Sequence, residues 1–339
     1  MDRRTLLGLT AALAATPALA RAQVNANAQV SAQEGMPTEA SLTLKPSLPM
    51  QDLWPGAAPG GEKVTATERS VLRKPGGDPN DTAFYNITKP RMSVRRPETP
   101  NGGAVLLIPG GGYVRVAVSK AGGEVDAWLA GLGYTVFTVT YRLPGDTWAA
   151  GPDVALQDAQ RAVRLIRSQA SQFGIDPHRL AIMGFSAGGH IAGLLATRFA
   201  EQTYAPIDAA DRLSARPAVA ALMYPVISMG EHAHKGSRQE ILKNVPAEAV
   251  EAVKVHASVE LHVPADAVPS FVGGTTDDPS VPAKNGILMY EALKAAKVPA
   301  ELHLWEGNTH GFPLRGKDGQ LLPWGPAALA FMQRHGLDA

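Results

Sequence analysis

The segment RLAIMGFSAGGHIAGLLATRFA, residues 179–200, links two largely apolar runs through a turn of glycine, alanine and serine. The first run is short, as expected for a buried strand, and the second is long enough for a helix. Between them, Gly184, Ser186 and Gly188 form the pattern G-x-S-x-G. At a strand-to-helix junction this pattern predicts that Ser186 is a nucleophile on a strained turn. The alternative is a structural glycine-rich turn.

The rest of the chain places this junction in an α/β fold. From residue 103 onward, buried apolar strands alternate with amphipathic helices, which predicts a mostly parallel sheet covered by helices on both faces. The strands are expected at 103–108, 134–143, 179–184, 218–226, 268–274 and 300–307, and the helices at 123–133, 152–174, 187–200, 282–298 and 326–335. In such folds, ligands bind beyond the carboxyl ends of the strands.

Together with the remaining segments, these elements predict a single domain over residues 51–339. Residues 64–72 and 84–94 alternate in polarity, which predicts antiparallel edge strands. Residues 225–268 form the longest insertion between expected strands, and we interpret them as a small lid over the pocket.

The N-terminal residues have the pattern of an export signal. Arg3 and Arg4 precede an apolar stretch at 6–19, and residues 20–22 have the A-x-A form of a cleavage site. The paired arginines indicate the twin-arginine kind, although the general route remains open. A membrane-anchoring helix is the alternative, but the stretch is short for one. We therefore expect cleavage after residue 22, a flexible leader at 23–50, and an exported, periplasmic or secreted product.

Composition excludes several classes of function. The 32 Lys and Arg against 31 Asp and Glu give a net charge of +1, with no basic run suited to nucleic acid. The chain has no cysteine, which excludes disulfides, thiolate nucleophiles and Cys-ligated zinc. We expect no nucleic-acid partner, no metal and no stable membrane insertion after signal cleavage.

A serine nucleophile needs a histidine base, and His310 is the best placed of nine histidines. It lies in the loop WEGNTHGF, which follows the last expected strand and so reaches the same sheet edge as Ser186. His232 and His234 form an H-x-H pair without a third strong ligand, so a zinc site is not expected. We expect His178 to be solvated, His190 to be packed in the core, and His256, His262 and His303 to be structural; His335 lies in the last expected helix.

The loop after the preceding strand supplies the acid that a catalytic histidine requires. The segment FVGGTTDDPSVP contains Asp277 and Asp278, which gives the chain order Ser, Asp, His of an α/β-hydrolase. Either aspartate could instead cap the next helix, so these residues alone leave the choice open.

The glycines of IPGGGY, residues 108–113, follow the first buried strand and predict an oxyanion hole. Their backbone can approach a substrate closely, so the N–H groups of Gly111, Gly112 and Ala187 are expected to converge on one oxygen. The spacing matches neither phosphate-binding glycine pattern.

Taken in order, these motifs resemble a known family. The segments are IPGGGY, YRLPG, DAQRAVRLIR, GFSAGGH, YPVIS, TTDDPSVP and VPAELHLWEGNTHGF. Over residues 50–337 the chain resembles α/β-hydrolase esterases of the hormone-sensitive-lipase and feruloyl-esterase-like group, and within it bacterial secreted acetyl xylan esterases. The family's D-x-x-V-P pattern falls on Asp278, which the resemblance implies is the acid, with Asp277 as the fallback.

Two positions depart from the family pattern. Pro109 stands where the oxyanion loop usually has the histidine of H-G-G-G, so the loop must be braced differently. Asn308 and Thr309 replace two glycines that often precede the base.

The resemblance implies hydrolysis of a small-molecule or oligosaccharide ester by two-step acyl transfer without a cofactor. O-acetyl groups on plant carbohydrate such as xylan are the implied substrate. A short-chain carboxylesterase is the main alternative, followed by a serine oligopeptidase and a non-catalytic binding protein. Tyr113 and Trp148 are candidate sugar contacts, with ordinary loop packing as the competing interpretation. The oligomeric state is not indicated.

Overall fold

The computed structural model describes residues 50–73, 81–118 and 124–338. These residues belong to one compact unit. The expected signal at 1–22 and the leader at 23–50 lie outside the described residues, apart from residue 50.

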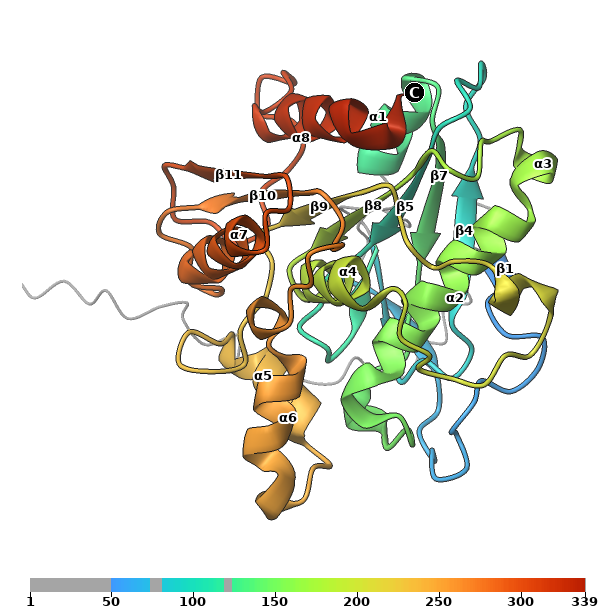
Figure 1. The fold of residues 1–339 in the computed structure, drawn as a ribbon, viewed down its shortest axis with the longest axis vertical. Helices are drawn as coiled ribbons and strands as arrows, with labels where there is room; N and C mark the ends of the chain where they lie inside the picture. The colour runs from blue at the N-terminus through green and yellow to red at the C-terminus, as the bar shows by residue number, and fades with distance from the viewer. Residues whose placement is uncertain (1–49, 74–80, 119–123, 339) are drawn as a thin grey trace, which may run out of the picture. The chain divides into compact units, whose positions relative to one another are not determined.

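The central sheet has eight strands, of which the six from β7 to the edge strand β11 are parallel (Figure 1). In spatial order they are β1 (Met50–Asp52), β4 (Arg91–Arg95), β7 (Thr135–Val139), β5 (Ala104–Ile108), β8 (Leu180–Phe185), β9 (Val219–Met223), β10 (Ser270–Thr275) and β11 (Ala300–Trp305). The pairs β1–β4 and β4–β7 are antiparallel, whereas β7 through β11 run parallel. The expected α/β-hydrolase fold with a mostly parallel sheet is confirmed.

Helices cover both faces of this sheet. The helices α2 (Val154–Ser168), α4 (Ala187–Arg198) and α7 (Lys284–Ala295) lie on one face, and α1 (Asp126–Gly131) and α8 (Trp324–Met332) lie on the other (Figure 1). Because side chains alternate along a strand, Leu106 and Ile182 pack toward the first group. Val105 and Met183, one residue away, pack toward the second. This two-sided burial explains why β5, β8 and β9 carry no polar residue.

The N-terminal strands differ from the sequence prediction. The stretch 64–72 becomes a strand only at β2 (Arg69–Leu72), which pairs with β3 (Thr82–Tyr85) and β6 (Val116–Ala117) in a separate antiparallel sheet. The expected strand 84–94 divides between β3 and β4 at Pro90. Proline cannot donate a ladder hydrogen bond, and the Pro90 carbonyl instead accepts from Leu53 N–H.

The insertion between β9 and β10 is helical. It contains α5 (Lys235–Leu242) and α6 (Val250–Ala257), followed by a short turn, η6 (Val259–Leu261). Figure 1 shows α5 and α6 together at the lower end of the view, away from α1 and α8. The other short helical segments are η2 (Pro144–Asp146), η3 (Gly151–Asp153), α3 (Ala170–Phe173), η4 (Ala209–Arg212), η5 (Ala247–Ala249) and η7 (Gln333–Leu337).

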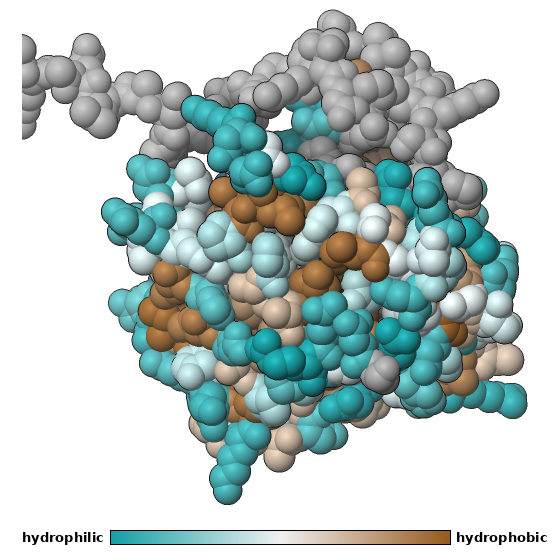
Figure 2. Space-filling model, turned by 90° about the horizontal axis from the view of Figure 1, so that it is seen from above, coloured by the Kyte–Doolittle hydropathy of each residue, from teal (hydrophilic) through white to brown (hydrophobic). Residues whose placement is uncertain are grey.

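The surface is mainly polar on the face shown in Figure 2, where hydrophobic residues form small, separate groups. Scattered exposed hydrophobic residues of this kind are normal for a globular domain. Among the described residues, no helix combines the length and hydrophobicity required to cross a bilayer.

A buried ion pair joins the loop after β7 to α2. Arg142 and Asp158 are both fully buried, and the Asp158 carboxylate also accepts hydrogen bonds from Arg142 N–H and from the Trp54 indole at 2.8 Å each. The Arg142 guanidinium donates further to the Pro59 carbonyl and to Gln157. A buried charge is tolerated only when it is paired and hydrogen-bonded in this way.

We therefore expect Asp158→Asn to lower the free energy of unfolding by about 3–5 kcal/mol, because it leaves the Arg142 charge buried without its partner. Chemical denaturation would measure the loss. The matched control is Asp52→Asn, which breaks an ion pair with Arg91 in which the Asp52 side chain is 60% exposed. Exposed pairs contribute about 0–1 kcal/mol. Equal losses in the two variants would contradict the prediction.

Candidate active site

Ser186 occupies the sharp turn between β8 and α4. Its backbone has φ 56° and ψ −118°, a strained conformation for a residue with a side chain. The Met223 carbonyl accepts the Ser186 N–H at 2.9 Å, and the Ser186 carbonyl accepts Val226 N–H at 3.1 Å. These bonds to the neighbouring strand and its loop hold the turn in place. A side chain at Gly188 would collide with the carbonyl oxygens of Ile108 and Pro109, so this helix start can approach β5 only with glycine.

His310 and Asp278 complete a hydrogen-bonded line with Ser186. His310 Nε2 lies 2.8 Å from Ser186 Oγ, and His310 Nδ1 lies 2.7 Å from Asp278 Oδ2. An ionised carboxylate only accepts, so Nδ1 carries the ring proton and Nε2 is free to accept from the serine hydroxyl. The three residues follow β8, β10 and β11, so the parallel strands bring them to one sheet edge.

The geometry distinguishes the two adjacent aspartates. The Asp278 side chain is 3% exposed, and its second oxygen accepts the N–H groups of Ser280 and Val281 at 2.8 and 2.9 Å. Asp277 is exposed, and its carboxylate accepts only from Thr276 among the described residues. Asp278 is therefore the carboxylate that orients His310. The sequence alone left this choice open.

The loop that carries His310 is held in place from two sides. The His310 ring packs edge-on against Tyr224, with the ring centroids 5.1 Å apart. Thr275 Oγ1, at the end of β10, donates to the Thr309 carbonyl at 2.8 Å. Asn308 and Thr309, which depart from the family pattern, thus still leave His310 in hydrogen-bonding position.

The loop after β5 that carries Gly110, Gly111 and Gly112, here called the glycine loop, lies directly against Ser186. A Cβ added at Gly110 would fall 3.0 Å from Ser186 Cβ and 2.7 Å from the Phe185 carbonyl oxygen. Gly111 and Gly112 follow with φ values of 145° and 65°. Among the residues that the structure describes, the N–H groups of Gly111, Gly112 and Ala187 have no recorded acceptor. This arrangement can serve as an oxyanion hole.

Pro109 shows how the loop is braced without the usual histidine. The Tyr141 hydroxyl, fully buried beneath the loop, donates to the Pro109 carbonyl at 2.8 Å. Burial raises the pKa of Tyr141, so this hydroxyl keeps its proton. A tyrosine from the loop after β7 therefore fixes the main chain just before Gly110.

The expected sugar contacts, Tyr113 and Trp148, are not supported by the structure. Tyr113 is 2% exposed and Trp148 is 6% exposed, so neither ring presents a face for stacking. Trp148 packs instead against the Arg142 guanidinium, 4.8 Å from its ring centroid. The Tyr113 hydroxyl lies 2.7 Å from His190 Nδ1. Aromatic residues in these loops fill the core, which was the competing interpretation.

His190 connects the glycine loop to the insertion. Its Nε2 lies 2.7 Å from the Ala257 carbonyl and therefore donates, so its Nδ1 accepts from Tyr113. Burial lowers the pKa of His190 to about 4, so the ring stays neutral. Its expected packing role is confirmed.

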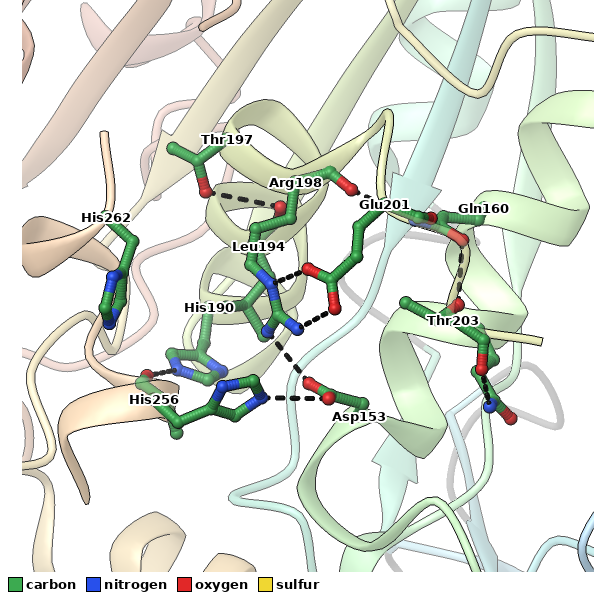
Figure 3. Close-up of polar contacts among 12 residues, drawn as sticks. Asp153, Gln160, His190, Leu194, Thr197, Arg198, Glu201, Thr203, His256 and His262 are labelled. Carbon is green, nitrogen blue, oxygen red and sulfur yellow. Dashed lines mark hydrogen bonds and ion pairs between the residues drawn. The ribbon is translucent and has the colours of Figure 1, made fainter. Parts of the chain in front are cut away.

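His256 anchors the same end of α6 to the core (Figure 3). His256 Nε2 lies 2.8 Å from Asp153, which also pairs with Arg198 at the end of α4. The Asp153 hydrogen bond raises the pKa of His256. Figure 3 shows that Arg198 also reaches Glu201, so one guanidinium joins two carboxylates. The insertion is thus tied to the helix that starts at Ser186.

Sequence analysis assigned no functional role to His234, which the fold places beside Gly112. It lies at the start of α5, with Cε1 3.7 Å from the point where a Cβ on Gly112 would sit. The H-x-H pattern was its only signal, and it was considered only as a metal site, which was not expected. In the described part of the chain, no group of three or more acidic or histidine side chains could hold a metal ion. Only the tertiary fold reveals that the insertion returns to the glycine loop.

Comparison with known proteins agrees with this architecture. The BD-FAE family profile matches residues 93–293, more than half of the chain. The chain belongs to the BD-FAE family of α/β-hydrolase esterases. The matched region includes Ser186, Asp278 and the glycine loop, while His310 lies beyond its end.

Several characterised proteins are similar to this BD-FAE chain. An acetylxylan esterase of Xylanibacter ruminicola is 31% identical over 66% of this chain and 44% of its own length. Endo-1,4-beta-xylanase B of Butyrivibrio fibrisolvens is 34% identical over 61% of this chain and 32% of its own length. The chain thus matches less than half of each of these two relatives. The crystal structure of an acetyl ester-xyloside bifunctional hydrolase from Caldicellulosiruptor lactoaceticus is 30% identical, with a TM-score of 0.68, over 88% of this chain and all of that one.

Proposed function

We propose that this BD-FAE chain is a serine carboxylic ester hydrolase with Ser186 as nucleophile, His310 as general base and Asp278 as the acid that orients it. The observation that carries the proposal is the hydrogen-bonded line from Ser186 Oγ through both nitrogens of His310 to Asp278. A nucleophile, a base and an orienting group in this arrangement are suited to acyl transfer.

The reaction proceeds in two steps. His310 Nε2 takes the Ser186 proton as Oγ attacks the ester carbonyl, and the amides of Gly111, Gly112 and Ala187 stabilise the oxyanion. The imidazolium, stabilised by Asp278, then protonates the departing alcohol and leaves an acyl-serine. In the second step His310 deprotonates a water molecule, which attacks the acyl group and releases the acid. Ser186 regains its proton at the end.

The proposed substrate is an O-acetyl ester of plant-derived carbohydrate, such as xylan or its oligosaccharides. Support comes from the acetylxylan esterase and the acetyl ester-xyloside hydrolase to which the chain is similar. The export pattern at residues 1–22 agrees with a polymer-derived substrate and supports a periplasmic or secreted location. A broad short-chain carboxylesterase is the second candidate, favoured by the similarity to Esterase LipI of Mycobacterium tuberculosis.

The decisive experiment measures acetate release from acetylated xylo-oligosaccharides and from an aryl acetate. We expect the oligosaccharide to have the higher kcat/KM, because binding contacts along the sugar contribute to transition-state stabilisation. Turnover of the aryl acetate alone would reject the carbohydrate assignment and favour the second candidate. Lack of turnover of both, together with no labelling by a fluorophosphonate, would reject the serine esterase itself.

A further inference from the structure

The insertion holds His234 beside Gly112 on a rigid segment. Asn285, which is 1% exposed on α7, accepts the N–H groups of Ile227 and Ser228 at 2.9 and 3.0 Å. Its amide also donates to the His232 carbonyl at 2.8 Å. The main chain leading to His234 is therefore fixed by a buried side chain of the core, and a group held in this way binds without a large ordering cost.

The hydrogen bonds of His234 determine which nitrogen carries its proton. Nδ1 accepts the Ser237 N–H at 3.1 Å and thereby caps α5. A backbone N–H can only donate, so Nδ1 is unprotonated and Nε2 bears the hydrogen in the neutral ring. Burial, and after it the electrostatic interaction with the neighbouring His310, lower the pKa of His234, while Asp278 raises it. Neutral His234 is thus a fixed Nε2–H donor at neutral pH.

This donor lies beside the glycine loop. The ring carbon between the two nitrogens, Cε1, lies 3.7 Å from the point where a Cβ on Gly112 would sit. Nδ1 is occupied by its hydrogen bonds to Ser237 in α5. The other ring nitrogen, Nε2, has no hydrogen-bond acceptor among the described residues. A donor without a protein acceptor beside the loop that is expected to bind the oxyanion is suited to bind a substrate oxygen.

We propose that His234 is a substrate-positioning residue whose Nε2–H donates to a hydroxyl oxygen adjacent to the ester on the alcohol part of the substrate. The inference rests on the proposed function, because it assumes that the amides of Gly111 and Gly112 bind the reacting oxygen. The carbonyl oxygen is the only hydrogen-bond acceptor of an acetyl group, and in the proposed mechanism the backbone amides bind it. An oxygen that accepts from His234 must therefore belong to the alcohol part of the substrate. A vicinal hydroxyl is what a monoacetylated sugar ring offers beside its ester.

A pair of sugar-free esters tests this directly. 2-Hydroxycyclohexyl acetate and cyclohexyl acetate differ only in the vicinal hydroxyl. The readout is the ratio of their kcat/KM values, compared between wild type and variants so that intrinsic reactivity cancels.

Two variants separate the role of His234 as the cap of α5 from its role as a hydrogen-bond donor to the substrate. His234→Asn keeps an oxygen that can cap α5 but lacks the Nε2–H group, so we expect the ratio to fall about tenfold, or about 1.4 kcal/mol. His234→Gln weakens the cap but carries an amide N–H near the position of Nε2, so we expect it to retain a higher ratio than His234→Asn despite lower stability.

The outcomes distinguish this inference from the proposed function. If the ratio is unchanged in His234→Asn, or both esters lose activity equally, His234 is not a substrate donor, even though Ser186-dependent hydrolysis persists. If neither ester is hydrolysed in a Ser186-dependent way, both proposals fall. If acetylated xylo-oligosaccharides are not hydrolysed but the ratio falls in His234→Asn, the inference is supported and only the carbohydrate assignment is lost.

Discussion

Replacing Ser186 with alanine is expected to lower kcat for an acetate ester by about 10⁴- to 10⁶-fold. The hydroxyl is the proposed nucleophile, and removing one member of a Ser-His-Asp set removes most of the catalysis that the set performs together. The remaining rate comes from the oxyanion amides and from substrate binding, which the substitution leaves in place. Steady-state kinetics on an aryl acetate would measure the loss.

Covalent labelling provides an independent readout of the same prediction. A fluorophosphonate should label the wild-type chain and fail to label Ser186→Ala. Ser171, exposed in α3, provides the matched control, because Ser171→Ala removes the same atom far from the sheet edge. Retained turnover or labelling in Ser186→Ala would show that another residue is the nucleophile.

The fold was predictable from sequence wherever the residues of one strand or helix are enough to indicate how that element is buried. The largely apolar strands at 103–108, 179–184 and 268–274 appear in the structure within two residues of their expected bounds, because burial on both faces favours apolar side chains. The N-terminal region was predicted less well. Alternation indicates a half-buried strand but not its partner, and β2 and β3 pair in a second sheet.

The site residues show a similar division. The proximity of Ser186 and His310 was predictable because each follows directly from an expected strand, and parallel strands bring such residues to one edge. The surroundings of Tyr113, Trp148 and His234 could not be predicted, because they come from segments distant in sequence. Tyr113 meets His190, 77 residues away, and His234 meets Gly112. No local pattern reports such contacts, so exposure could not be inferred from position in a loop.

The second large effect is expected from Asp278→Asn, which should lower kcat/KM by about 10⁴-fold while leaving the fold intact. The asparagine oxygen can still accept the N–H groups of Ser280 and Val281, which Asp278 Oδ1 now binds. Its amide group would then face His310 Nδ1 as a donor. That favours the tautomer with hydrogen on Nε2, which cannot accept the serine proton.

Asp277→Asn is the matched control, since it makes the same change one residue away on an exposed side chain. We expect its kcat/KM to stay at the wild-type level, because its carboxylate does not contact His310. Both variants should also be compared for the rate of fluorophosphonate labelling, which reports the nucleophilicity of Ser186 without depending on the ester chosen. A large loss in Asp277→Asn with little change in Asp278→Asn would overturn the assignment, and equal losses would mean that both carboxylates act on His310 through its electrostatic environment. A loss confined to Asp278→Asn would show that His310 depends on one directional hydrogen bond, since both substitutions remove the same charge from adjacent positions.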